Sequence, residues 1–288
     1  IASTRLSDYL IESGGILNIN SSQGESDIDS ELGAKLSLVG SSVTIGSEIT
    51  LPSGELDIRA KSGDVTISSA LSVAGSSRSF YDVVKFADAG NIRITSDNGN
   101  IVLAEGSSLS VMGDNVGGGA GTLAIAASVG SFTNQGILLG QSAAGFDGGS
   151  FTLDVGTIGD FAEINAPLEE GGFNNLISLR IRSGDVAVDQ KVTSREFRLS
   201  TDGGDITVSA EIDASGKTGG TISLGASGSL TLSESGLLSV EGENFNSAGK
   251  GGLVELFTGS QINGVIAQFV AQQLAAIAPG QHQQQNES

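Results

Sequence analysis

The sequence predicts an all-β protein, a parallel β-helix or β-solenoid with about three short strands in each lap and an amphipathic helix at its C-terminal end. Three observations lead to this prediction. A five-residue unit, in which glycine precedes two alternating apolar residues, recurs along most of the chain. Groups of these units return at longer intervals, as expected of laps that stack on one another. The composition combines 43 Gly and 38% apolar residues with only 5% aromatic residues, which suits many short strands and tight corners.

The composition also excludes several classes of protein. The 288 residues contain no Cys, so the chain holds neither disulfides nor a thiolate metal site. Lys and Arg number 14 against 33 Asp and Glu, which gives a formal net charge of −19. This charge repels phosphate backbones and anionic membrane surfaces, so we expect no nucleic-acid partner. No apolar stretch reaches the roughly 18 residues of a membrane span, and we expect no span.

Each recurring unit is typical of a short strand. Two apolar side chains fall on one face, and the small or polar residue between them falls on the other. Gly, Asn, Asp or Ser bound the strands and tolerate the backbone conformations of tight corners. The units begin at Gly15, Gly54, Gly63, Gly90, Gly99, Gly121, Gly149, Gly184, Gly204, Gly220 and Gly228.

The order of the units predicts what the strands build. From Gly220, three apolar strands and a polar loop over 241–250 lead to the next strand, which begins at Gly252. One such lap cannot bury its apolar face alone, but it can stack on copies of itself, with each strand pairing with its equivalent. A β-sandwich is the alternative. A sandwich would require hairpin dipeptides between its strands and a concentrated aromatic core, whereas only 5% of these residues are aromatic, and a sandwich rarely exceeds roughly 250 residues as one unit.

The apolar period changes near the C-terminus. We predict a β-helix rod over 1–258, an amphipathic capping helix over 259–278 and a disordered Gln-rich tail over 279–288. The helix would cover the open end of the last lap, or it would contact another chain. It has no Lys or Arg, which argues against a membrane-surface helix. Its apolar face comprises Ile262, Val265, Ile266, Phe269, Val270, Leu274 and Ile277.

The cadence of the repeats resembles a known family. The stretches 212–224 and 90–103, with the loop written Ala-Ser-Gly-x-x-Gly-Gly in the first, resemble the filamentous haemagglutinin type of large bacterial exoprotein, over most of residues 14–257. The resemblance implies a right-handed parallel β-helix that a dedicated outer-membrane partner pore secretes. It also implies a role as an adhesin, a filament shaft or a toxin-bearing stick, and a location at the bacterial cell surface.

Few residues point to chemistry. The single His282 lies in the predicted tail, so no His-based catalytic or metal site is expected in the rod. Ser-Gly-Lys-Thr at 215–218 lacks the glycine that a phosphate-binding loop requires at position 211, and a strand rather than a helix follows it. We therefore predict no catalytic residues and no cofactor. Asp27, Asp29 and Glu31 alternate and are weak candidates for a hard cation, although a solvated loop is the better explanation of them.

Two phenylalanines are candidates for contact with a ligand. Phe173 and Phe245 lie in the predicted loops 169–175 and 241–250, and such loops protrude from a solenoid and carry recognition. The other phenylalanines, Phe80 and Phe86 among them, are expected to stack in the interior or to close corners.

These observations favour a non-catalytic extracellular rod, a segment of a larger secreted surface protein. Its loops would contact a host-cell, matrix or polysaccharide surface. A self-assembling extracellular filament, whose partner is a second copy of the chain, is one alternative. A polysaccharide-cleaving β-helix enzyme is another, and it would need two or three carboxylates in one lateral groove.

Overall fold

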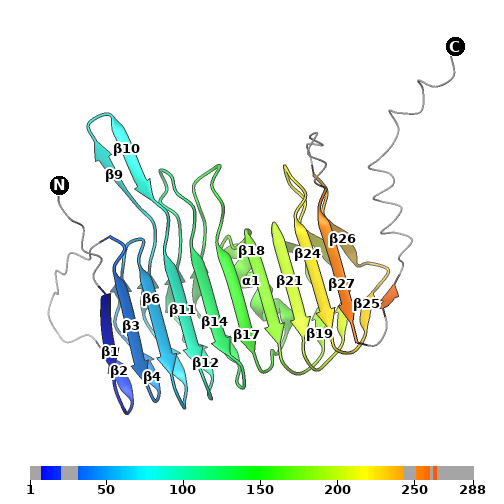
Figure 1. Ribbon diagram of the computed structural model, residues 1–288, viewed down its shortest axis with the longest axis horizontal. Coiled ribbons are helices and arrows are strands. Elements are labelled where there is room, and N and C mark those ends of the chain that lie inside the picture. The colour runs from blue at the N-terminus through cyan, green and yellow to red at the C-terminus, as the bar shows by residue number, and fades with distance from the viewer. Residues whose placement is uncertain (1–7, 21–31, 243–250, 260–261, 265–288) are drawn as a thin grey trace.

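A computed structural model describes residues 8–20, 32–242, 251–259 and 262–264 (Figure 1). The glycine-led units form strands, as the sequence predicts. In strand β7 (Val65–Ile67), for example, Val65 and Ile67 point into the core and are fully buried, whereas Thr66 between them is partly exposed. The alternation of side chains along an extended backbone explains this pattern.

Most strands belong to three rows, which we number by the order in which the chain visits them. The first row is one sheet of ten parallel strands, which follow one another along the length of the molecule in Figure 1. In spatial order it contains β1 (Asp8–Glu12), β3 (Lys35–Gly40), β6 (Glu55–Ala60), β11 (Asn91–Ser96), β14 (Thr122–Ala127), β17 (Ser150–Val155), β18 (Leu176–Ile181), β21 (Glu196–Thr201), β24 (Thr221–Ala226) and β27 (Leu253–Thr258).

The second and third rows are each divided into two sheets. The second row contains β2 (Leu17–Ile19), β4 (Val43–Ile45), β7, β12 (Ile101–Leu103) and β15 (Phe132–Asn134), then β19 (Val186–Val188), β22 (Ile206–Val208), β25 (Leu230–Leu232) and β28 (Ile262–Gly264). The third row contains β5 (Ile49–Thr50), β8 (Ala70–Ser72), β13 (Ser108–Ser110) and β16 (Ile137–Leu139), then β20 (Val192–Thr193), β23 (Glu211–Asp213) and β26 (Leu237–Ser239).

Equivalent strands pair in parallel and in register from one lap to the next. Leu56 of β6 lies beside Ile92 of β11, which lies beside Leu123 of β14. Because the register is constant, each inward position forms a continuous column of Ile, Leu, Val and Phe side chains. The predicted all-β, parallel solenoid architecture is therefore confirmed.

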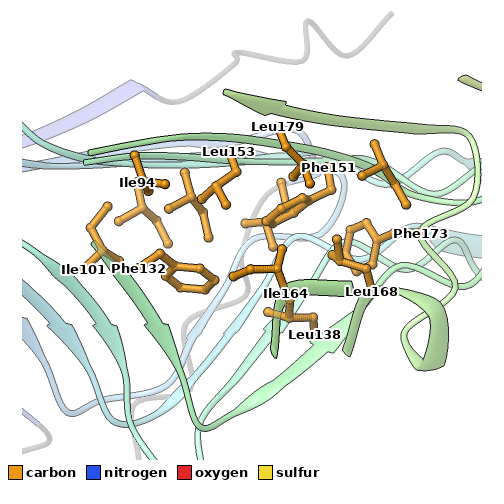
Figure 2. Packing of buried hydrophobic residues seen from close by; sticks show 14 of the residues in the cluster. Ile94, Ile101, Phe132, Leu138, Phe151, Leu153, Ile164, Leu168, Phe173 and Leu179 are labelled. Carbon is orange, nitrogen blue, oxygen red and sulfur yellow. The ribbon is translucent and has the colours of Figure 1, made fainter. Parts of the chain in front are cut away.

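One helix interrupts the second and third rows. After β17 the chain forms α1 (Phe161–Glu170) in place of further strands. The Asp160 carboxylate caps the helix by accepting the Ala162 N–H at 3.1 Å. Ile164 and Leu168 point inward and pack with Phe132, Leu138 and Phe173 (Figure 2). This helix was not expected from the sequence.

The structure corrects the predicted C-terminal boundary. Ile262 begins strand β28, which pairs in parallel with β25, so the sheets extend past residue 258 and no helix begins at Ile262. The spacing of the apolar residues is compatible with a helix, but the backbone of residues 262–264 forms a strand because it pairs with β25 of the preceding lap. Val265, Ile266, Phe269, Val270, Leu274 and Ile277 lie outside the described residues.

No helix in the described part of the chain is both long enough and apolar enough to cross a membrane.

Candidate contact surface

Three insertions leave the solenoid at one corner, where the chain passes from the third row back to the first. They span residues 76–87 between β8 and β11, 113–120 between β13 and β14, and 140–149 between β16 and β17. The first of them forms a hairpin of β9 (Ser76–Phe80) and β10 (Val83–Ala87), which projects beyond the sheets in Figure 1. Tyr81, with φ of 55°, forms its tip together with Asp82.

Apolar side chains gather on these insertions. We call the set the corner ridge; each of its members has an exposed fraction of at least 40%, and Tyr81 is fully exposed. Such a group of exposed large apolar side chains is typical of an interaction site. The corner ridge consists of Phe80, Tyr81, Val83, Val84, Phe86, Val116 and Phe146.

The insertions support one another from lap to lap. The rings of Phe86 and Phe146 meet edge to face, with centroids 5.2 Å apart. A Cβ atom at position 117 would lie 2.7 Å from Cε1 of Phe86, so any larger residue there would have to displace the Phe86 ring. The Gly119 N–H donates to the Asp88 carboxylate at 2.7 Å and closes the base of the hairpin onto the next loop. The corner ridge is therefore held by packing and hydrogen bonds.

Two cations lie side by side on the hairpin. Arg78 of β9 is directly opposite Lys85 of β10, and both are exposed. Like charges in this arrangement destabilise a strand pair. Among the basic side chains of the described residues, only Arg78, Lys85 and Lys217 have no carboxylate within ion-pair distance. Phe80 is two residues from Arg78 along β9, and Val83, which lies opposite Phe80, is two residues from Lys85 along β10. Because side chains alternate between the two faces of a strand, all four lie on the same face of the hairpin.

The other basic residues have a structural role. Most of them form ion pairs between laps, such as Arg180 with Asp202 of the next lap at 2.9 Å and Lys61 with Glu12, two laps away, at 2.6 Å. The hydrogen bond from Arg180 lowers the pKa of Asp202, and the hydrogen bond from Lys61 lowers the pKa of Glu12. These carboxylates are held ionised, which suits lap-to-lap pairing and not proton transfer.

The structure corrects the predicted contact residues. Phe173 is only 1% exposed and packs against Phe151, with ring centroids 6.0 Å apart, because helix α1 turns its loop inward. Phe80 and Phe86, which were expected to stack in the interior or to close corners, are exposed on the hairpin. The available sequence signal for this hairpin was the set of β-branched and aromatic residues on either side of Tyr81 and Asp82, namely Phe80, Val83, Val84 and Phe86.

The remaining candidates lie outside the described residues; they are Phe245 and the weak cation ligands Asp27, Asp29 and Glu31. Within the part of the chain that the structure describes, no group of three His, Cys, Asp or Glu side chains could hold a metal ion.

Comparisons with known proteins give no match: no family model, no curated protein and no solved structure matches this chain.

Proposed function

We propose that this chain is a non-catalytic structural and adhesive rod, a segment of a larger secreted bacterial surface protein, that makes contact through its corner ridge. The observation that carries the proposal is the clustering of exposed aromatic side chains on insertions that all leave one corner. A stack of laps supplies a stiff support, and the insertions stand away from it. The coil is right-handed, with three strands in a regular lap, and an outer-membrane partner secretes it.

The chemistry of the hairpin favours an acidic polysaccharide as the ligand. Tyr81 and Phe80 offer apolar ring faces, which sugar rings cover well, and Arg78 and Lys85 supply positive charge for a carboxylate or sulfate group. The hairpin carries one acidic residue, Asp82, so it is locally basic on a chain of net charge −19. The net negative charge of the whole molecule would repel an extended anionic surface. A single flexible strand of polysaccharide would contact mainly the hairpin and would be attracted by its local positive charge.

The test uses the purified chain on immobilised polygalacturonate, with neutral dextran as the reference matrix. We expect retention on polygalacturonate that weakens with salt, because exposed charges are screened. The double variant R78S/K85S should lose retention, and so should Tyr81→Ser. Lys217→Ser is the matched control, since Lys217 is also unpaired but lies on a different loop. Equal retention of all variants, or release of shortened or unsaturated sugars, would contradict an adhesive ridge; the latter would indicate an enzyme.

A filament subunit is the second candidate. It is favoured by the two edge strands of the first row, β1 and β27, which expose Leu10 and Phe257 respectively. Parallel edge strands with exposed apolar side chains can pair end to end and produce an open polymer. Light scattering that grows with protein concentration would support the filament, and a monomer at every concentration would argue against it.

A further inference from the structure

Helix α1 leaves a gap in the second row. The sheet that ends at β15 and the sheet that begins at β19 are separated by the lap of β17, which contains α1 and no second-row strand. The helix contacts β16, β19 and β20 most closely. One edge of β15 is therefore left beside the first turns of the helix and not beside another strand.

The hydrogen bonds of the preceding laps show which groups of β15 are unpaired. In each lap, the first residue of the second-row strand donates its N–H to a carbonyl of the following lap. The equivalent residue in β15 is Phe132, and its N–H has no hydrogen-bond partner among the described residues. The earlier bonds run from Val43 N–H to Asp64 O at 3.1 Å, from Val65 N–H to Asn100 O at 2.9 Å and from Ile101 N–H to Ser131 O at 2.9 Å.

The carbonyl groups repeat the pattern. The last residue of each second-row strand accepts an N–H from the following lap, and the equivalent carbonyl in β15 is that of Asn134, again without a partner in the described chain. Because Ser131 and Gln135 bond back to β12, the N–H and C=O of both Phe132 and Asn134 face the gap. The earlier bonds are from Ser68 N–H to Ile45 O at 2.9 Å, from Ala104 N–H to Ile67 O at 2.8 Å and from Gln135 N–H to Leu103 O at 2.8 Å.

A groove of about 710 Å³ lies along this edge. Its floor includes Phe132 and Ile164, which are buried side by side (Figure 2). Its rim carries two exposed carboxylates, Asp160 and Glu163, and none of its lining residues is a Lys or Arg. The groove therefore combines an unpaired strand edge, an apolar floor and a negative rim.

We propose that this groove binds an extended peptide segment of a partner protein, which adds to β15 as a further strand and places a basic side chain between Asp160 and Glu163. An extended peptide supplies the alternating N–H and C=O groups that Phe132 and Asn134 lack. A sugar would not match the groove, since its only aromatic ring, Phe132, is buried. The negative rim selects a basic segment over an acidic one. The site is separate from the corner ridge, and neither proposal depends on the other.

The test measures backbone amide exchange in the full chain by NMR. In the free protein, the Phe132 and Asn134 amides should exchange faster than the Thr133 amide, which is positioned to bond to β12. The probe is the peptide acetyl-STVKVTS-amide, and the reference peptide replaces its lysine by glutamate. At saturation, the lysine peptide should slow exchange at Phe132 and Asn134 by at least about tenfold, while Thr133 stays unchanged.

Charge variants test the rim. Glu163→Lys should weaken the lysine peptide about two- to fivefold and improve the glutamate peptide, as expected for an exposed charge pair. Glu169→Lys is the matched control, since Glu169 is exposed on the same helix but does not line the groove; it should bind both peptides as the unmodified chain does. Far-UV circular dichroism checks that both variants keep the fold.

Three outcomes would overturn the proposal. The lysine peptide could fail to protect Phe132 and Asn134 at millimolar concentration, or the glutamate peptide could protect them equally. The two amides could also become protected as the protein concentration rises without peptide, which would show that a second copy fills the groove.

Discussion

At the residue scale, the recurring glycine has a steric explanation. Gly54, Gly90 and Gly121 lie just before three successive strands of the first row. Gly90 stacks on the backbone of Gly54, and Gly121 stacks on the backbone of Gly90. A Cβ atom at position 90 would lie 1.7 Å from the Gly54 carbonyl oxygen, and one at 121 would lie 1.8 Å from that of Gly90. The laps can therefore approach to strand-pairing distance only if this position has no side chain.

We expect Gly121→Ala to destabilise the protein by about 1–3 kcal/mol, because the added methyl group meets backbone atoms that cannot rotate away. Gly14→Ala is the control, since a Cβ atom there has nothing within 4 Å. Urea unfolding gives both values. Equal stability of the two variants would contradict the steric explanation.

The inward and outward faces of the strands give a second prediction. Ile222 and Leu230 are 0% and 1% exposed, whereas Ser223 is partly exposed on the outer face of β24. Ile222→Asp or Leu230→Asp would bury an unpaired charge and should cost on the order of 4 kcal/mol. Ser223→Asp should be nearly silent. Thermal unfolding followed by circular dichroism compares them, and the same tolerance at all three positions would refute the assignment of faces.

At the element scale, strands are joined by backbone pairing and by ion pairs on the outer surface. Arg180 of β18 bonds to Asp202, which directly follows β21, through both carboxylate oxygens. Lys191 similarly reaches Glu211 of β23 at 2.6 Å, and the bond raises the pKa of Lys191. Such exposed pairs contribute little stability individually, but they favour the native register, because a shifted strand would lose its partner.

The Arg180 pair gives a pH-dependent prediction. Because the folded chain lowers the pKa of Asp202 below its ordinary value of 3.8, the pair stabilises the protein above that value. The contribution is lost as pH falls through the lower, folded pKa. Asp202→Asn should therefore lower Tm slightly at pH 7, and its difference from the unmodified chain should shrink towards zero below pH 3.8.

Comparing the two proteins at each pH removes the other effects of acid, including the loss of overall charge repulsion. Asp82→Asn on the hairpin tip is the control, because Asp82 makes no ion pair in the described structure and should show no such convergence. A difference in Tm for Asp202→Asn that persists unchanged at pH 2 would contradict the assignment.

At the scale of the whole molecule, the net charge and the exposed apolar side chains have opposite effects on association between molecules. The net charge of −19 keeps molecules apart at pH 7, while the corner ridge and the edge strands expose apolar side chains. The sequence has a pI of about 4.2, so repulsion vanishes close to that pH.

We expect light scattering to detect association near pH 4.2 and not at pH 7 in low salt, because the net charge, and with it the repulsion between molecules, falls to zero near the pI. The double variant F80S/F86S should associate less at the acidic pH if the corner ridge makes the contact. A variant that associates as strongly as the unmodified chain would assign the contact to the edge strands.

Helix α1, the burial of Phe173 and the corner ridge could not be predicted from the sequence. Helix α1 carries a capping signal, Asp160 followed by Glu163, but its apolar residues are too few for periodicity to distinguish a helix from another short strand. Phe173 was expected in an exposed loop and is buried, because α1 and Phe151 cover it. Neither of the predicted contact residues, Phe173 and Phe245, belongs to the corner ridge. The exposure of the ridge residues depends on which loops stack at one corner of the solenoid, and the sequence alone does not show this.

The strands and their parallel stacking follow from the sequence, because the alternation of Gly, apolar and small residues is local and every lap must bury its apolar face against the next. The place where helix α1 interrupts the stack, and the side-chain contacts outside the stack, depend on the three-dimensional fold. The contact of Phe86 with Phe146 and the open edge of β15 both depend on segments that are far apart in the chain and that local patterns do not connect.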